Sequence, residues 1–157
     1  MKKHSFSRRA LGVLATIGLA ACATVPESET KPAGTNVLSR KAINTAMKGR
    51  VDFVRHVKPI LENKCVMCHN RRAMLGYMSL ENQKEAKRTG ALGSFIVSGH
   101  PEHSLLIAKV AGGYPMISSM PIVGMQTTAE ERTILTKWVK EGAPWPAGAS
   151  GTLRIPH

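Results

Sequence analysis

One short run in this sequence, Cys65-Val66-Met67-Cys68-His69, has the residue types and spacing for cofactor chemistry. Two cysteines separated by two residues and followed at once by a histidine form the pattern that attaches haem covalently through two thioether bonds. The adjacent imidazole then reaches the iron from the proximal side. The run therefore predicts one covalent haem c, held by Cys65 and Cys68, with His69 as an iron ligand.

Three other uses of the same cysteines are less favoured. A zinc site needs four ligands, and the histidines left to complete one (His56, His100 and His103) follow no recognised spacing. A thioredoxin-like redox pair needs a βαβ context, which the sequence does not indicate. A structural disulfide would suit an oxidising compartment but gives His69 no role.

The second axial position of the iron has several candidate ligands. Methionine with histidine raises the reduction potential and suits electron transfer, whereas an open position suits binding of gases or peroxide. Met116, Met120 and Met125 lie on the long segment before the last predicted helix, and His100 and His103 are further candidates. Met120 is followed by Pro121, which stiffens the chain that carries its thioether.

The N-terminus has the layout of an export signal. Four basic residues lie within residues 1–9 (Lys2, Lys3, Arg8 and Arg9), and an apolar run follows. The run is too short to cross a membrane, which takes about 20 apolar residues. It ends in Leu19-Ala20-Ala21-Cys22, which resembles the bacterial lipobox, so Cys22 is predicted to be lipidated; an ordinary signal peptide with an incidental cysteine is the alternative. Ser7-Arg8-Arg9-Ala10-Leu11 is similar to a twin-arginine signal, which leaves the export route open.

The predicted location is the periplasmic side of a membrane, with the lipid as anchor. Ala23 after the lipidated cysteine mildly favours the outer membrane. The chain carries a net charge of +12, and loss of residues 1–21 leaves +8. So basic a domain attracts acidic proteins, anionic lipid or nucleic acid, and export makes nucleic acid the weakest candidate. We predict an acidic redox-protein partner, with steering by the basic residues around the attachment run: Lys58, Lys64, Arg71 and Arg72.

The apolar pattern predicts an all-α domain with no strands. One helix is expected over 51–63, interrupted near Pro59, with the apolar face Phe53, Val54, Val57, Ile60 and Leu61. Another begins at Thr128, which forms a capping box with Glu131, and ends at Gly142. Weaker helical candidates cover 79–88 and 101–110.

The ends of the exported chain are expected to be less ordered. Residues 22–50 have the composition of a flexible tether, in which Val37, Leu38, Ile43 and Met47 leave open a short amphipathic helix. Residues 147–157 are expected to form a loose tail. His56 is expected to be a surface histidine beside a helix start.

Between these ends, residues 51–146 resemble the planctomycete-type cytochrome c domain, a branch of the class I cytochrome c fold. The matching stretches are Val51–Arg55, Lys58–Leu61, Cys65–His69, Gly99, Pro101-Glu102, Ser104–Leu106, Met120-Pro121 and Trp138–Pro146. The resemblance implies a few helices around one haem, with the first and last helices packed crosswise near Phe53 and Trp138. It also implies that Met120 is the distal ligand.

The chain departs from the family at His56 and His100, where an acidic residue is common, and at Ile122, where a second proline is common. Ligation by His100 or His103 therefore remains a fallback. The predicted function is one-electron transfer by a monohaem cytochrome. The alternatives are an enzyme or sensor that binds a small ligand or peroxide at an open distal site, and an interaction domain that the haem merely stabilises.

Overall fold

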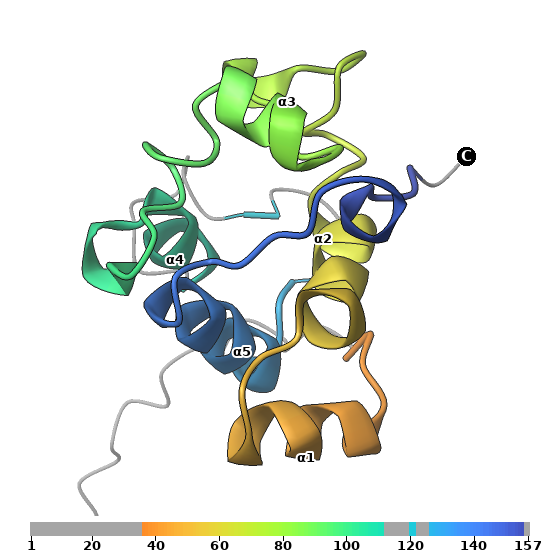
Figure 1. Cartoon of the computed structure of the whole chain (residues 1–157), viewed down its shortest axis with the longest axis vertical. Helices are drawn as coiled ribbons and strands as arrows, with labels where there is room; N and C mark the ends of the chain where they lie inside the picture. The colour runs from red at the N-terminus through yellow and green to blue at the C-terminus, as the bar shows by residue number, and fades with distance from the viewer. Residues whose placement is uncertain (1–35, 112–119, 122–125, 156–157) are drawn as a thin grey trace, which may run out of the picture. The chain divides into compact units, whose positions relative to one another are not determined.

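The computed structural model describes residues 36–111, 120–121 and 126–155, and these residues form helices joined by turns. Apart from an isolated bridge between Leu92 and Ile96, the described residues form no β-structure, which confirms the all-α prediction. None of the described helices is long and apolar enough to span a membrane. The elements, arranged as in Figure 1, are α1 (Arg40–Lys48), η1 (Phe53–Val57), α2 (Lys58–Lys64), η2 (Leu75–Tyr77), α3 (Gln83–Arg88), η3 (Pro101–His103), α4 (Leu105–Val110), α5 (Ala129–Lys140) and η4 (Ala149–Gly151).

The expected first helix is present but is divided at Pro59. A π-helical turn, η1, begins after Asp52, whose carboxylate accepts the Arg55 N–H at 2.7 Å. The α-helical part α2 then starts with Pro59 in its first turn, where a missing N–H costs no hydrogen bond. Of the predicted apolar face, four residues are buried, but Val54 is 42% exposed. The π turn advances the chain by more residues than an α turn, so the side chains that follow are displaced from the 3.6-residue pattern.

Helix α5 follows the prediction closely. Thr128 accepts the Glu131 N–H through its hydroxyl, and Glu131 accepts the Thr128 N–H at 2.9 Å, so the capping box is complete. The predicted buried face is fully enclosed: Ile134, Leu135, Trp138 and Val139. Gly142 ends the segment with a φ of 99°, a conformation that favours glycine.

Three aromatic rings join α5 to the first helical segment. The ring centroids of Phe53 and Trp138 lie 6.0 Å apart, which confirms the expected contact between them. Trp145, beyond the end of α5, packs 4.8 Å from Phe53 and 6.1 Å from Trp138. Each indole N–H donates to a backbone carbonyl, that of Trp138 to Pro144 and that of Trp145 to Gly151. A chain with only 4% aromatic residues thus concentrates three of them at one contact.

Order begins earlier than the predicted boundary of the tether at residue 50. Helix α1 is capped by Ser39 and buries Ile43 and Ala46. The Lys137 ammonium of α5 donates to the Ala46 carbonyl at 2.9 Å and also to the Gly49 carbonyl, which fixes the C-terminal end of α1. The amphipathic helix left open by the sequence therefore forms and packs. The signal over 1–21, Cys22 and the remaining tether to residue 35 lie outside the described residues.

The tail also differs from the loose segment expected over 147–157. Leu153 is buried, and its N–H donates to the Glu81 carbonyl at 2.7 Å. Glu62 of α2 accepts the Arg154 N–H at 2.8 Å and pairs with its guanidinium at 3.2 Å. The segment that follows α5 runs across the face seen in Figure 1 toward α2. Local composition gave no sign of this order, because its partners lie far away in the sequence.

His56 is buried and links two helical segments, whereas the sequence predicted a surface residue. Its side chain accepts the Asp52 N–H at Nδ1 (2.9 Å) and contacts the Thr45 hydroxyl through Nε2 (3.1 Å). Since Thr45 donates its own proton to the Ala42 carbonyl, Nε2 must carry the imidazole proton. Burial lowers the pKa of His56, as expected for a neutral imidazole that links α1 to η1.

Substitution of Gly151 by alanine tests the packing of the tail. An added Cβ would lie 1.7 Å from the Pro146 carbonyl oxygen and 3.0 Å from the Trp145 ring. We expect Gly151→Ala to lower the free energy of unfolding by about 1–3 kcal/mol, the usual cost of overpacking, as measured by chemical denaturation. Gly49→Ala is the matched control, because its Cβ would meet only the Thr45 carbonyl at 3.4 Å. Equal stability of the two variants would contradict the packed tail.

Candidate haem-attachment site

Helix α2 delivers the attachment run directly from its C-terminal end. The Cys65 and Val66 N–H groups both donate to the Leu61 carbonyl, at 3.0 and 2.9 Å. The turn then closes on itself, with the His69 N–H donating to the Cys65 carbonyl at 3.0 Å. Val66 is fully buried and secures the turn to the core. The two cysteines and the histidine therefore occupy one helix-like turn with a fixed backbone.

The imidazole of His69 is oriented by one backbone carbonyl. Its Nδ1 lies 2.8 Å from the Leu75 carbonyl oxygen, and a carbonyl can only accept, so Nδ1 carries the proton. Burial lowers the pKa of His69, which favours the neutral ring. The lone pair of Nε2 is then free of a proton, and no described residue hydrogen-bonds to it. A neutral imidazole held by Nδ1–H with Nε2 available is the arrangement that a metal ligand requires.

A turn with left-handed backbone conformations orients the Leu75 carbonyl toward His69. Met74, Gly76 and Tyr77 have φ values of 46°, 68° and 58°, all in the left-handed region. Two of these residues have side chains, for which this conformation costs about 1–2 kcal/mol each. Backbone strain of this kind is concentrated at functional sites, and here it accompanies the turn that presents the Leu75 oxygen to His69.

Asn70 fixes the same loop from inside. Its side chain is 4% exposed, and its amide N–H groups donate to the carbonyls of Val66 and Met67. Its amide oxygen accepts the N–H groups of Arg72 and Ala73 at 2.8 and 3.0 Å. One buried side chain thus satisfies two carbonyls before the histidine and two amides after it.

The attachment run does not form a zinc site by itself, because among the described residues its two thiols and imidazole are not grouped closely enough to share one ion. Burial, and then the neighbouring Cys68, raise the pKa of Cys65 to about 12, so this thiol stays neutral at physiological pH. Thiol–disulfide exchange requires a thiolate, so the raised pKa of Cys65 disfavours a redox role for this thiol. Neither Cys65 nor Cys68 is in a disulfide. The donor set, two thiols and an oriented imidazole on one turn, fits covalent haem instead.

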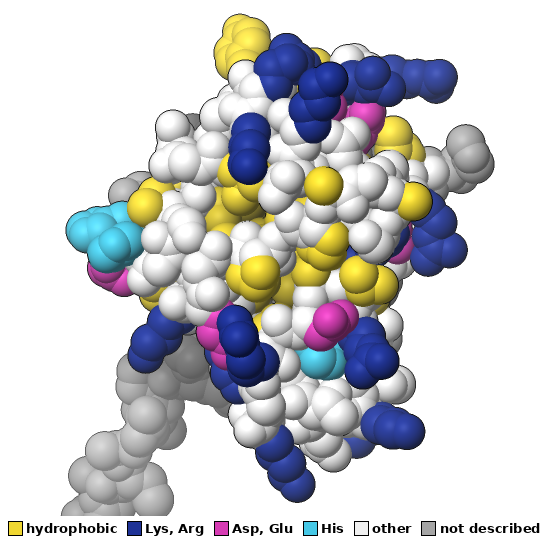
Figure 2. All heavy atoms as spheres, viewed as in Figure 1, with side chains coloured by type: hydrophobic (Ala, Val, Ile, Leu, Met, Phe, Trp, Pro, Cys, Tyr) yellow, Lys and Arg dark blue, Asp and Glu magenta, His cyan; other side chains and the backbone are white. Residues whose placement is uncertain are grey.

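The surroundings also fit a large apolar group. Met67, Leu75 and Tyr77, within or just after the run, are 62%, 52% and 89% exposed. Figure 2 shows apolar side chains gathered in the middle of one face, with Lys and Arg side chains toward its edge. Exposed apolar side chains close in sequence to the attachment run would suit an apolar ligand such as a macrocycle.

Met120 is described only together with Pro121. Its backbone N–H donates to the Lys109 carbonyl of α4 at 3.0 Å, and the Pro121 carbonyl accepts the Gln126 side-chain amide. The Met-Pro pair is therefore tied to the end of α4 and to the chain leading into α5. The other methionine candidates, Met116 and Met125, lie outside the described residues.

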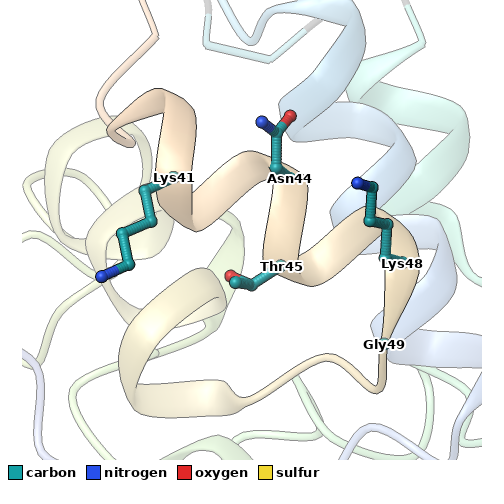
Figure 3. A pocket seen from close by; sticks show the side chains of 5 residues that line it. All are labelled: Lys41, Asn44, Thr45, Lys48 and Gly49. Atoms are coloured by element: carbon teal, nitrogen blue, oxygen red, sulfur yellow. The ribbon is translucent and has the colours of Figure 1, made fainter.

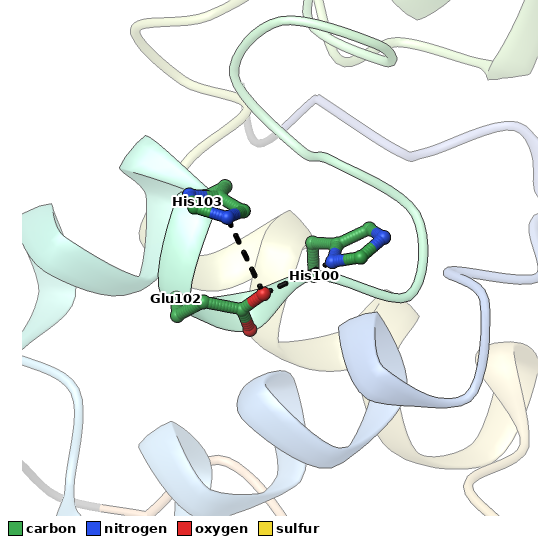
Figure 4. A group of neighbouring side chains, drawn as sticks. All are labelled: His100, Glu102 and His103. Carbon is green, nitrogen blue, oxygen red and sulfur yellow. Dashed lines mark hydrogen bonds and ion pairs between the residues drawn. The ribbon is translucent and has the colours of Figure 1, made fainter.

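The fallback ligands His100 and His103 lie on the surface. Their side chains are 59% and 72% exposed, and both face the carboxylate of Glu102, as Figure 4 shows. His100 Nδ1 is 3.0 Å from Glu102 Oε1, and His103 Nε2 is 3.6 Å from the same atom. The structure thus groups these two histidines with each other around a carboxylate.

Of the basic residues predicted to steer a partner, Lys64 cannot do so. Its side chain is fully buried, 3.7 Å from the equally buried Glu131 carboxylate, and donates to the Gln126 carbonyl at 2.9 Å. Arg71 and Arg72 are exposed, although Arg71 also pairs with Glu81 at 2.7 Å. Lys64 is buried because it pairs with Glu131, the residue that caps the start of α5.

A surface depression on α1 is unrelated to the predicted chemistry. It is lined by Lys41, Asn44, Thr45, Lys48 and Gly49. In Figure 3 these side chains point in different directions and not toward a common centre. No residue of the attachment run contributes to it.

Sequence reasoning identified the reactive residues but not those that orient them. The Leu75 carbonyl and Asn70 act through backbone geometry, for which no motif exists. The position of Asn70 directly after the attachment run was the one available signal, since buried asparagine often bonds to nearby backbone.

The comparison with protein families agrees with this site. The model for the family described as planctomycete cytochrome C matches residues 65–121. The matched segment begins at the first cysteine of the attachment run and ends at the Met120-Pro121 pair. The match confirms the expected resemblance over this segment, which is shorter than the predicted domain at 51–146. Similarity to a cytochrome c family agrees with haem c as the cofactor.

One curated relative is the hydrazine synthase subunit alpha of Kuenenia stuttgartiensis, 27% identical over 143 aligned positions. The alignment covers 73% of this chain but only 18% of the relative, so the chain corresponds to a small part of that protein. No solved structure shows a significant match.

Asn70 offers a test of the loop that orients His69. In Asn70→Ala the Val66 carbonyl loses its buried donor and the N–H groups of Arg72 and Ala73 lose their acceptor; an unsatisfied buried group costs about 1–3 kcal/mol. We expect a fall of about 2–3 kcal/mol in the free energy of unfolding of the purified protein. Asn63→Ala is the control: Asn63 is exposed, its side-chain amide donates to the Pro59 carbonyl at 2.8 Å, and its loss should change stability by less than about 1 kcal/mol. Similar losses in both variants would count against a special role for Asn70.

Proposed function

We propose that this chain is a monohaem c-type cytochrome that passes single electrons between redox partners on the periplasmic side of a membrane. The observation that carries the proposal is the orientation of His69, whose Nδ1 is held by the Leu75 carbonyl 2.8 Å away while Nε2 has no described partner. Haem attached to Cys65 and Cys68 would supply an iron that takes up and releases one electron.

The chain's own residues would hold that group in place. The turn fixed by Asn70 spaces the two thiols and presents the imidazole. The exposed apolar side chains of Met67, Leu75 and Tyr77 would cover part of the macrocycle and limit the access of water, which raises the reduction potential. The exposed guanidinium groups of Arg71 and Arg72 would attract an acidic partner to this region.

For the distal position we propose Met120. Its thioether would raise the potential further and close the iron to exogenous ligands. His100 and His103 rank behind it, because both are exposed and already paired with Glu102. The anchoring of Met120 to α4 through the Lys109 carbonyl supports a fixed position for this residue.

Substitution of Met120 by alanine tests both the haem and its distal ligand. The wild-type protein, produced with haem-maturation machinery, should carry one haem that survives denaturation and, when oxidised, show the weak red-edge sulfur-to-iron absorption band. Met120→Ala should abolish the band, lower the midpoint potential and let the reduced protein bind carbon monoxide. Met47→Ala, on α1, is the control and should retain the band.

Each failure of this experiment has a distinct meaning. Absence of covalent haem from the wild-type protein would overturn the cytochrome assignment. A haem protein that lacks the band and binds carbon monoxide as isolated would overturn the electron-carrier proposal in favour of an open distal site.

That outcome would support the second candidate function, a haem site that binds a small ligand or peroxide within a larger enzyme. The similarity to a subunit of hydrazine synthase over 73% of this chain favours it. The identity of 27% and the small share of the relative that is matched place it behind the electron carrier.

We further propose that Cys22 carries a lipid that anchors the exported protein, with the outer membrane mildly favoured. The supporting feature is the lipobox-like run Leu19-Ala20-Ala21-Cys22 at the end of the apolar segment. Acyl chains contribute about 0.8 kcal/mol per buried CH₂, so two or more chains hold a protein firmly without a spanning helix.

Cell fractionation tests the anchor. Cys22→Ser should move the protein from the membrane fraction to the soluble periplasmic fraction, because the acyl chains can no longer be attached. Ser28→Ala, in the same tether, should remain with the membrane. Retention of Cys22→Ser in the membrane fraction would refute the lipid anchor.

A further inference from the structure

A second group of metal-binding side chains lies outside the haem-attachment site. The ligand atoms of His100, Glu102 and His103 all lie within 4.8 Å of one another, and all three side chains are exposed. Glu102 pairs with the two histidines and, within the described part of the chain, with no lysine or arginine. A cation that bound here would therefore not have to displace a basic side chain from the carboxylate.

The backbone that carries these residues is fixed. Ser104, 2% exposed, donates to the His100 carbonyl at 2.8 Å and accepts the Val97 N–H at 2.9 Å. The Gly99 N–H donates to the Val139 carbonyl of α5 at 2.8 Å, and the Ser98 hydroxyl donates to the Gly142 carbonyl. The short turn η3 is thus held at the C-terminal end of α5, so binding there need only arrange three side chains.

The distances suit a small divalent ion. Bonds of about 2.0–2.1 Å to nitrogen and oxygen in a tetrahedral site place neighbouring ligand atoms roughly 3.3 Å apart. The observed separations of 3.0 Å and 3.6 Å from Glu102 Oε1 to the two imidazole nitrogens lie on either side of this value. Small side-chain rotations would therefore admit an ion between them.

We propose that His100, Glu102 and His103 form a surface site for a divalent transition-metal ion, with two imidazoles and one carboxylate as ligands and water completing the coordination. Imidazole ligands favour zinc, copper and nickel over magnesium and calcium. The site lies outside the Cys65–His69 run, and it rests on Met120, not His100 or His103, as the distal haem ligand.

Calorimetric titration of the haem-loaded full-length protein with Zn²⁺, in a buffer that does not chelate metals, tests the proposal. The wild-type protein should bind one equivalent that is lost in the double variant His100→Ala/His103→Ala. Glu102→Gln should weaken binding by at least about tenfold, since loss of even an outer-shell partner costs 10–100-fold. Zn²⁺ should also raise the thermal unfolding midpoint of the wild-type protein and not that of the double variant.

Two controls distinguish binding at this cluster from binding elsewhere on the protein. His157→Ala removes one histidine but leaves the cluster intact, so it should bind like the wild-type protein. If the haem does not attach, the free thiols of Cys65 and Cys68 are the other metal ligands, and their binding would persist in the double variant. Equal binding by the wild-type protein and the double variant, or no binding by either, would overturn the proposal.

Discussion

The hydrogen bond between His69 Nδ1 and the Leu75 carbonyl is the interaction on which the proposed haem chemistry depends. A histidine can present a lone pair at Nε2 only if its proton resides on Nδ1, and a carbonyl acceptor 2.8 Å away secures that tautomer. The acceptor itself requires a turn with left-handed residues at 74, 76 and 77. The cost of that turn is offset by the buried network of Asn70 and by the attachment of Val66 to the core.

A second constraint is the fully buried carboxylate of Glu131, which joins three parts of the chain. It accepts the Val37 N–H at 2.8 Å, caps α5 through the Thr128 N–H, and pairs with Lys64. Lys64 directly precedes the first cysteine, so the attachment turn is tied to the start of α5. A buried charge is costly unless it is fully paired, and this requirement makes the arrangement specific.

The sequence predicted the parts of this structure that are encoded locally. The capping box of α5, its buried face and the Cys65–His69 run are recognisable from neighbouring residues, and the family resemblance supplied the contact between Phe53 and Trp138. The ordered tail and the burial of Lys64 depend on partners distant in sequence: Glu62 with Arg154, and Lys64 with Glu131. The burial of His56 depends on the packing of α1, through Thr45, in a segment that was expected to be a tether. The π turn at η1 likewise breaks the helical period, which is why Val54 is exposed where a regular helix would bury it.

The two axial ligands of the proposed haem differ in the same way: one is positioned by residues near it in the sequence and the other by residues further away. The proximal ligand belongs to one continuous, internally bonded segment from α2 to the 74–77 turn, so its geometry is set by sequence neighbours. Among the described residues, the Met120-Pro121 pair is bonded to the Lys109 carbonyl and to Gln126, whose carbonyl in turn accepts Lys64. Changes around that pair would alter the distal ligand while the attachment turn stayed intact. If the chain carries the proposed haem, ligand access and reduction potential could therefore vary on the Met120 side without loss of covalent attachment at Cys65 and Cys68.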